Sequence, residues 1–186
     1  MSSGNSNSSV DREAGLLVDF VNTWDQDEGI DAIADAAALE SWIRGSDGEV
    51  GAAEIDEAGH HRVLALRGAL RALMLANNGR PADDQAVAPL RAAAARARYR
   101  TVLGAEGELE LAPEGEGAPA FEARLLLALE RLQATGAWPR LKVCPDETCE
   151  WAFFDESRNR SRTWCSMEVC GNRAKTRRYR RRRATT

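Results

Sequence analysis

Cysteine is absent from residues 1–143, and all four cysteines of the 186-residue chain lie between Cys144 and Cys170. A disulfide-stabilised secreted protein distributes its bridges over a small fold, so this clustering instead favours a metal site in a reducing compartment. No apolar run exceeds five residues, whereas a membrane helix needs roughly 20. Residues 1–9 have neither the basic region nor the apolar stretch of a secretion signal. We therefore expect a disordered N-terminus over residues 1–9 and a cytoplasmic, nucleoid-associated protein without membrane contact.

Signals of catalysis are scarce as well. The chain has two histidines, His60 and His61, and adjacent residues point to different faces of a helix, so they make a poor metal pair. We expect both to be surface residues. The sequence contains no recognisable nucleophile–base pair and no glycine-rich phosphate loop. The prediction is that the protein is not an enzyme.

Charge is distributed unevenly along the chain. The net charge of −4 and the pI near 5.4 argue against a nucleic-acid partner when taken as a whole. Residues 1–139, however, carry 12 basic and 23 acidic residues, a balance of −11, and residues 140–186 carry 13 and 6, a balance of +7. An acidic body joined to a basic C-terminal region indicates a polyanionic partner.

The N-terminal region is predicted to be mainly helical. Apolar residues recur there at three- and four-residue intervals, and glycine, asparagine and proline supply stop signals. Asp35 is an expected N-cap, and Pro89 either kinks a helix or occupies the first turn of a shorter one. Helices are expected over residues 14–24, 35–44, 54–77, 83–99 and 120–135, with a turn at Asp47-Gly48, a hairpin over 101–111 and a flexible link over 113–119.

The cysteines follow the pattern Cys144-x4-Cys149-x15-Cys165-x4-Cys170. Two close pairs joined by a short loop suit tetrahedral zinc, because each pair supplies two thiolates from one turn. Four protein ligands leave no open position for catalysis, so we expect one structural zinc ion held by these four residues. The neighbouring aromatic residues either form a small core around the metal or stack on bases; they are Trp151, Phe153, Phe154 and Trp164.

A basic helix is expected after Cys170, with Asn172 as its N-cap. Upstream, three arginines alternate with Asn159 and Ser161, so an extended loop would place the arginines on one side. Arginine and lysine bind phosphates, and asparagine can bond to phosphate or base edges. The alternative is a solvated charge run, or a tail that docks on the acidic body. The predicted nucleic-acid contacts are Arg158, Arg160, Arg162, Asn172, Arg173, Lys175, Arg177, Arg178, Arg180 and Arg181.

Over about 45 residues the C-terminal region resembles the CGNR zinc finger. The motif that names this family is present as Cys170-Gly171-Asn172-Arg173, followed by Ala174-Lys175, and no ligand position departs from the pattern. The matching residues before it are Cys149, Phe154, Asp155, Ser157, the arginine-rich stretch to Arg162, and Trp164-Cys165-Ser166-Met167.

The N-terminal region resembles the ABATE domain, which is paired with this finger in bacterial proteins regarded as stress-induced transcription regulators. The matching segments are residues 19–23 (DFVNT), 38–42 (ALESW) and 66–71 (LRGALR). The expected fold is mainly α (α+β). It has a disordered start over 1–9, a helical ABATE-like domain with a small hairpin over 10–137, and a treble-clef-like zinc finger with a basic helix over 138–186.

The resemblance implies a regulator that binds duplex DNA through the finger, while the N-terminal domain senses a ligand or mediates assembly. A small-molecule effector and a homodimer are both open. Candidate ligand contacts are Asn22, Thr23 and Arg67, and the alternative is that they form a helix terminus and a salt bridge. An RNA-binding or ribosome-associated module would use the same charges. A small-molecule binder would keep the finger only as a stabilising appendage.

Overall fold

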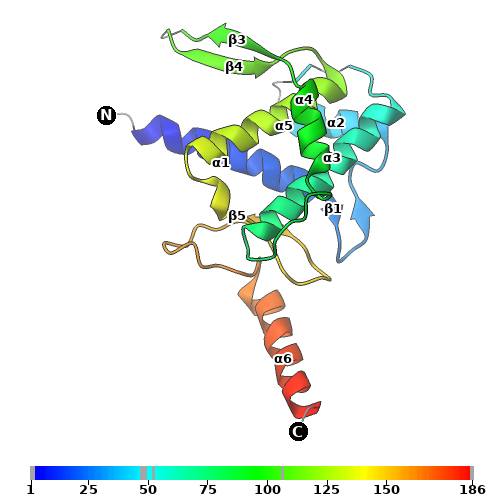
Figure 1. The fold of residues 1–186 in the computed structure, drawn as a ribbon, viewed down its shortest axis with the longest axis vertical. Helices are drawn as coiled ribbons and strands as arrows, with labels where there is room; N and C mark the ends of the chain where they lie inside the picture. Colours follow the sequence, from blue (N-terminus) through cyan, green and yellow to red (C-terminus); the bar gives the residue numbers. More distant parts are fainter. Residues whose placement is uncertain (1–2, 47–49, 52, 106, 185–186) are drawn as a thin grey trace.

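The computed structural model describes residues 3–46, 50–51, 53–105 and 107–184, and 54% of the chain is helical. Three long helices lie at its centre (Figure 1): α1 (Ser3–Val21), α3 (Glu57–Ala76) and α5 (Gly117–Ala134). All three pack against one another in pairs. This helical body with small antiparallel strand pairs confirms the predicted mainly α class.

Two shorter helices complete the body. Helix α2 (Ala36–Ser46) begins after Asp35, whose carboxylate accepts the backbone N–H of Ala38 at 2.8 Å, so the predicted N-cap is confirmed. Helix α4 (Ala88–Arg96) packs on α3 and α5 and has Pro89 in its first turn, where the missing N–H is not needed. The second of the two alternatives for Pro89 is therefore correct.

An aromatic cluster joins α1, α2 and α5. The ring centroid of Phe20 lies 5.4 Å from that of Phe121 and 5.8 Å from that of Trp42, and Trp42 and Phe121 are also 5.8 Å apart. Phe20 and Phe121 are fully buried, with leucines of α1, α3 and α5 around them. This cluster holds α2 against the three central helices.

Each strand pair is a two-stranded antiparallel ribbon. The predicted hairpin is present as β3 (Tyr99–Leu103) and β4 (Leu109–Pro113), which lie at the opposite end of the molecule from the C-terminal helix (Figure 1). The short ribbon of β1 (Trp24–Asp25) and β2 (Ile30–Asp31) was not predicted, because two-residue strands leave no alternating pattern in the sequence.

Several local expectations need correction. Helix α1 ends at Val21, so Trp24 lies in β1 and not on the helix. It also begins at Ser3, although residues 1–9 were expected to be disordered; extending a helix anchored by buried residues costs little once it is nucleated. His60 is buried, not exposed, and its Nε2 lies 2.8 Å from the carbonyl oxygen of Ile33. The predicted turn at Asp47-Gly48 lies outside the described residues.

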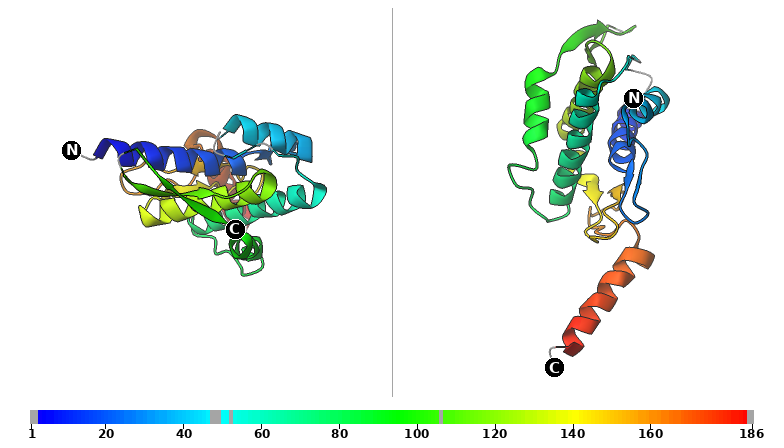
Figure 2. Two further views of the ribbon diagram at one scale, coloured as in Figure 1. Left: turned by 90° about the horizontal axis from the view of Figure 1, so that it is seen from above. Right: turned by 90° about the vertical axis from the view of Figure 1, so that its right-hand side faces the viewer.

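The C-terminal region begins with a short helical turn, η1 (Trp138–Arg140), and a third ribbon of β5 (Leu141–Val143) and β6 (Ala152–Phe154). Leu141, Val143 and Ala152 are buried in the same apolar cluster as the helical body. Helix α6 (Asn172–Ala184) follows and projects away from the body (Figure 2). The ribbon therefore shares the core of the N-terminal helices, whereas α6 does not.

Candidate metal centre and basic surface

The four cysteine sulfur atoms converge at the junction between the third ribbon and α6. All four Sγ atoms lie within 4.8 Å of one another, with Cys149 3.5 Å from Cys165 and Cys165 3.7 Å from Cys170. Four ligands at the usual Zn–S distance of about 2.3 Å stand roughly 3.8 Å apart in a tetrahedron. The observed separations match that geometry, so the four cysteines are positioned to bind one zinc ion.

The electrostatics of the thiols lead to the same assignment. Burial, together with the neighbouring sulfur atoms, raises the pKa of Cys170 to about 12, and the same causes raise the pKa of Cys165 further. Four adjacent thiolates would repel one another in a partly buried site, so a cation is needed to hold them ionised. Zinc supplies that charge and binds thiolate sulfur directly.

Two turns present the ligand pairs. In the first, Cys149 donates its backbone N–H to the carbonyl of Asp146 at 2.8 Å, and Asp146 accepts from the hydroxyl of Thr148 at 3.0 Å. In the second, a wide helical turn, η2 (Met167–Gly171), carries Cys170 and runs directly into α6. Because a metal ligand lies in the turn that starts α6, a zinc ion bound there would fix the direction of that helix.

The predicted N-cap at Asn172 is wrong. Asn172 already has helical backbone angles, and its side-chain amide donates back to the carbonyl of Glu168 at 2.8 Å. The cap is Ser166, whose hydroxyl accepts the backbone N–H of Val169 at 3.2 Å. The continuous wide turn between Ser166 and α6 explains the difference, since helical structure begins at Met167, five residues before Asn172.

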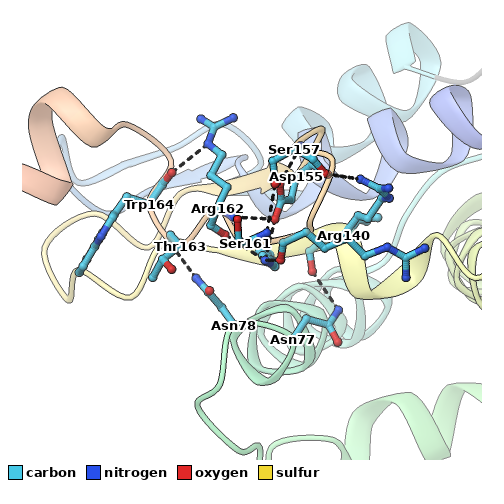
Figure 3. Close-up of polar contacts among 12 residues, drawn as sticks. Asn77, Asn78, Arg140, Asp155, Ser157, Ser161, Arg162, Thr163 and Trp164 are labelled. Atoms are coloured by element: carbon cyan, nitrogen blue, oxygen red, sulfur yellow. Dashed lines mark hydrogen bonds and ion pairs between the residues drawn. The ribbon is translucent and has the colours of Figure 1, made fainter.

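Two buried charged residues, Lys142 and Asp155, organise the arginine-rich loop (residues 158–162). Lys142 donates to Asp155 at 2.7 Å and to the carbonyls of Arg160 and Arg162 at 2.7 and 2.9 Å. Asp155 also accepts from the Ser157 hydroxyl and the Arg162 backbone N–H (Figure 3). Burial alone would raise the pKa of Asp155, but hydrogen bonds from Lys142 and Ser157 lower it to about 2. Contacts within the protein therefore hold the backbone of the loop.

The end of α3 anchors the same region. The Asn77 amide donates to the carbonyls of Trp138 and Leu141, both at 2.9 Å. The next side chain, Asn78, donates to Val143 at 2.9 Å and to Thr163 at 2.7 Å (Figure 3). Two consecutive asparagines thus connect the helical body to the third ribbon and to the arginine-rich loop.

Some of the predicted nucleic-acid contacts instead bind other groups of the protein itself. Arg162 lies with its guanidinium carbon 4.8 Å from the centre of the Phe153 ring and donates to the carbonyls of Trp164 and Cys165. Arg177 forms an ion pair with Asp146 at 2.9 Å, and Arg173 forms one with Asp27 at 3.5 Å. Hydrogen bonds from Arg177 and Thr148 keep the pKa of Asp146 below its usual value although burial opposes them. Arg177 thus links α6 to the first ligand turn.

Other predicted contacts face solvent. Among the predicted contacts, five exposed cationic side chains have no hydrogen-bond or ion-pair partner within the described residues: Arg158, Arg160, Lys175, Arg178 and Arg180. Arg160 has a positive φ of 52°, so the extended loop that the alternation predicts is instead a tight turn. The remaining basic residue among the predicted contacts, Arg181, is exposed on α6 and interacts with a neighbouring group.

Comparison with protein families matches residues 14–143 to ABATE, described as "Putative stress-induced transcription regulator". The match covers more than two thirds of the chain. The chain belongs to the ABATE family. Residues 140–183 match the CGNR zinc finger, so the predicted pairing of the two is confirmed. A search of curated proteins found no match.

In this ABATE chain, the three candidate ligand contacts all have internal partners. Arg67 donates to both oxygens of Asp31 at 2.6 and 2.7 Å and to the Thr23 hydroxyl at 3.0 Å. The Asn22 amide bonds to the backbone of Ala152 in the finger. These contacts favour the structural alternative for all three residues. No helix in the described part of the ABATE chain is both long and apolar enough to cross a membrane.

Proposed function

We infer that the protein is a transcription regulator that binds duplex DNA through α6 and the arginine-rich loop, while its helical body senses a ligand or mediates assembly. The observation that carries this proposal is the position of α6. The helix starts at the zinc site and projects from the body into solvent (Figures 1 and 2). Its 13 residues span about 20 Å along the helix axis. The major groove of DNA is wide enough to admit an α-helix.

The charge of α6 supports a polyanionic partner. Eight of its residues are basic and none is acidic. Like charges on successive turns destabilise an isolated helix, and phosphates relieve that repulsion. The loop adds Arg158 and Arg160 on a turn that Lys142 and Asp155 hold in place. Helix α6 and the arginine-rich loop are therefore two basic elements at the same end of the protein.

The salt dependence of binding tests this proposal. If about five phosphates are contacted, the logarithm of the association constant falls with the logarithm of salt concentration at a slope of roughly −4 to −5. The measurement uses fluorescence anisotropy of a labelled duplex with zinc-loaded protein. A slope near zero would refute electrostatic binding to phosphates. Competition between duplex DNA and a structured RNA at fixed salt separates DNA recognition from the RNA-binding alternative.

Sequence recognition needs its own experiment. In vitro selection from a random duplex library with zinc-loaded protein should enrich one site, and the Cys165→Ser variant, which loses a zinc ligand, should enrich none. Failure of the wild-type protein to enrich any sequence would leave non-specific binding only. We propose no catalytic role, because the described geometry is assigned to zinc binding and to the basic surface.

A further inference from the structure

A groove between α1 and α2 is not used by the zinc site or by the basic surface. It has a volume of about 560 Å³, within the usual range for small-molecule sites. Figure 2 shows the two helices side by side. The lining of the groove includes Arg12, Gly15 and Asp19 from α1 and Ser41, Trp42 and Gly45 from α2. It therefore combines an aromatic ring, a carboxylate and a hydroxyl with one guanidinium group.

Two helix glycines keep the groove open. Gly15 lies inside α1 and Gly45 near the end of α2, where glycine destabilises a helix relative to alanine. A Cβ atom built on either residue meets nothing within 4 Å, so neither glycine is required by a packed neighbour. A side chain at either position would instead occupy the groove.

The carboxylate of Asp19 is available for a ligand. Gly15 and Asp19 are one turn apart on the same face of α1. In the described part of the chain, Asp19 has no hydrogen-bond or ion-pair partner. Partial burial raises its pKa, and no neighbouring group opposes that shift. Arg12 lies two helical turns from Asp19 along α1, 3.9 Å from the carboxylate of Glu13, which also pairs with Arg124 at 2.6 Å and Arg131 at 2.7 Å.

We propose that this groove binds a small organic cation, with the ammonium group on Asp19 and its apolar body against Trp42. Trp42 is half-buried and is held in place by Phe20 and Phe121. A rigid indole beside a carboxylate is the combination that recognises organic ammonium groups. An anion would be repelled by Asp19, and a neutral molecule would leave the carboxylate unpaired.

The position of the groove suggests how a ligand affects the finger. Asp19 lies three residues before Asn22, whose amide bonds to Ala152 in β6 at 2.8 and 3.0 Å. The helix that lines the groove is thus the helix on which the finger docks. This regulatory role rests on the proposed function, whereas binding of the cation does not. The binding experiment therefore contains no DNA, so that its failure does not bear on DNA binding.

The experiment titrates full-length, zinc-loaded protein with phenethylammonium and follows the Trp42 indole signal by NMR, assigned with Trp42→Phe. A probe of this size should bind with a Kd on the order of 10 mM. Phenethyl alcohol, which lacks the charge, should bind about tenfold more weakly. Asp19→Asn should remove this preference for the cation. Equal binding of the two probes to the wild-type protein, or no shift at tens of millimolar, would overturn the proposal.

Two glycine substitutions separate filling of the groove from loss of folding. Gly15→Leu introduces a good helix former and should abolish binding of phenethylammonium while the far-ultraviolet circular dichroism stays unchanged. Gly68→Leu is the matched control, because Gly68 is an exposed glycine of α3 with open space around its Cβ position and does not line the groove. It should bind like the wild-type protein. Full binding by a folded Gly15→Leu variant would also reject this site.

Discussion

The side-chain amide of Asn22 pairs with the backbone of Ala152, 130 residues further along the chain. Its Oδ1 accepts the backbone N–H at 2.8 Å and its Nδ2 donates to the carbonyl at 3.0 Å, as a neighbouring strand would. This contact joins the residue that follows α1 to β6. Together with Asn77 and Asn78, it makes the helical body and the third ribbon one packed unit.

Asn22→Ala should therefore destabilise the protein. The change leaves the buried N–H and carbonyl of Ala152 without these partners, which costs about 1–3 kcal/mol. For a chain of this size, the melting temperature should fall by about 3–8 °C. Thermal unfolding of zinc-loaded protein measures the effect. Asn159→Ala, in the exposed loop, is the control and should melt like the wild-type protein. Equal melting of the two variants would show that the pairing is not stabilising.

Removal of zinc should loosen only part of the finger. The sequence alone predicts that chelation unfolds residues 140–170 and leaves the N-terminal helices folded. The structure narrows that expectation, because Leu141, Val143 and Ala152 are buried in the core of the helical body, whereas η2 carries a zinc ligand and neither η2 nor α6 contributes to that core. We expect chelation to release residues 163–184 and to leave β5 and β6 paired.

Hydrogen–deuterium exchange with and without a chelator checks this expectation. Amides of η2 and the start of α6 should exchange at least about 100-fold faster after zinc removal, while those of β5 and β6 stay protected. Re-addition of zinc is the control and should restore the slow exchange. Loss of protection in β5 and β6 to the same extent would show that the metal, and not the apolar core, stabilises the ribbon.

Asp155 should make the free energy of unfolding depend on pH in the acidic range. Its pKa is about 2 in the folded protein against an ordinary value of 3.8, so the folded state holds the proton less tightly. A lowered pKa contributes stability that is complete above about pH 4 and is lost as pH falls through about 2. The shift corresponds to about 2 kcal/mol.

Asp155→Asn isolates this term. The difference in unfolding free energy between the wild-type protein and the variant should be largest above pH 4 and should shrink towards pH 2. Chemical denaturation at several pH values measures it. Zinc loss in acid affects both proteins and cancels in the difference. A difference that does not change between pH 4 and pH 2 would show that Lys142 does not hold Asp155 ionised.

Local features of the finger were predictable from the sequence, and long-range ones were not. The four zinc ligands follow from two close pairs of one residue type, a pattern that coordination geometry itself imposes. The roles of Asn22 and Arg162 could not be derived, because their partners, Ala152 and the ring of Phe153, are placed by tertiary packing. A polar residue at a helix end and an arginine in a basic run have the same sequence signature whether they bind a ligand or the protein.

Arg177 and Arg178 are adjacent on α6 and should respond differently to substitution. Arg178 is exposed and has no partner within the described residues, so Arg178→Ala should remove one phosphate contact. The association constant should fall about fivefold at 0.15 M salt and the salt slope should become shallower by about 0.9, with unchanged stability.

Arg177→Ala instead removes the ion-pair partner of the buried Asp146 carboxylate. It should destabilise the finger by about 1–3 kcal/mol and leave the slope of the folded protein nearly unchanged. Anisotropy titrations at four salt concentrations, together with thermal unfolding, measure both quantities for both variants. The reverse pattern, with a shallower slope for Arg177→Ala only, would place the DNA on the face of α6 that now contacts Asp146.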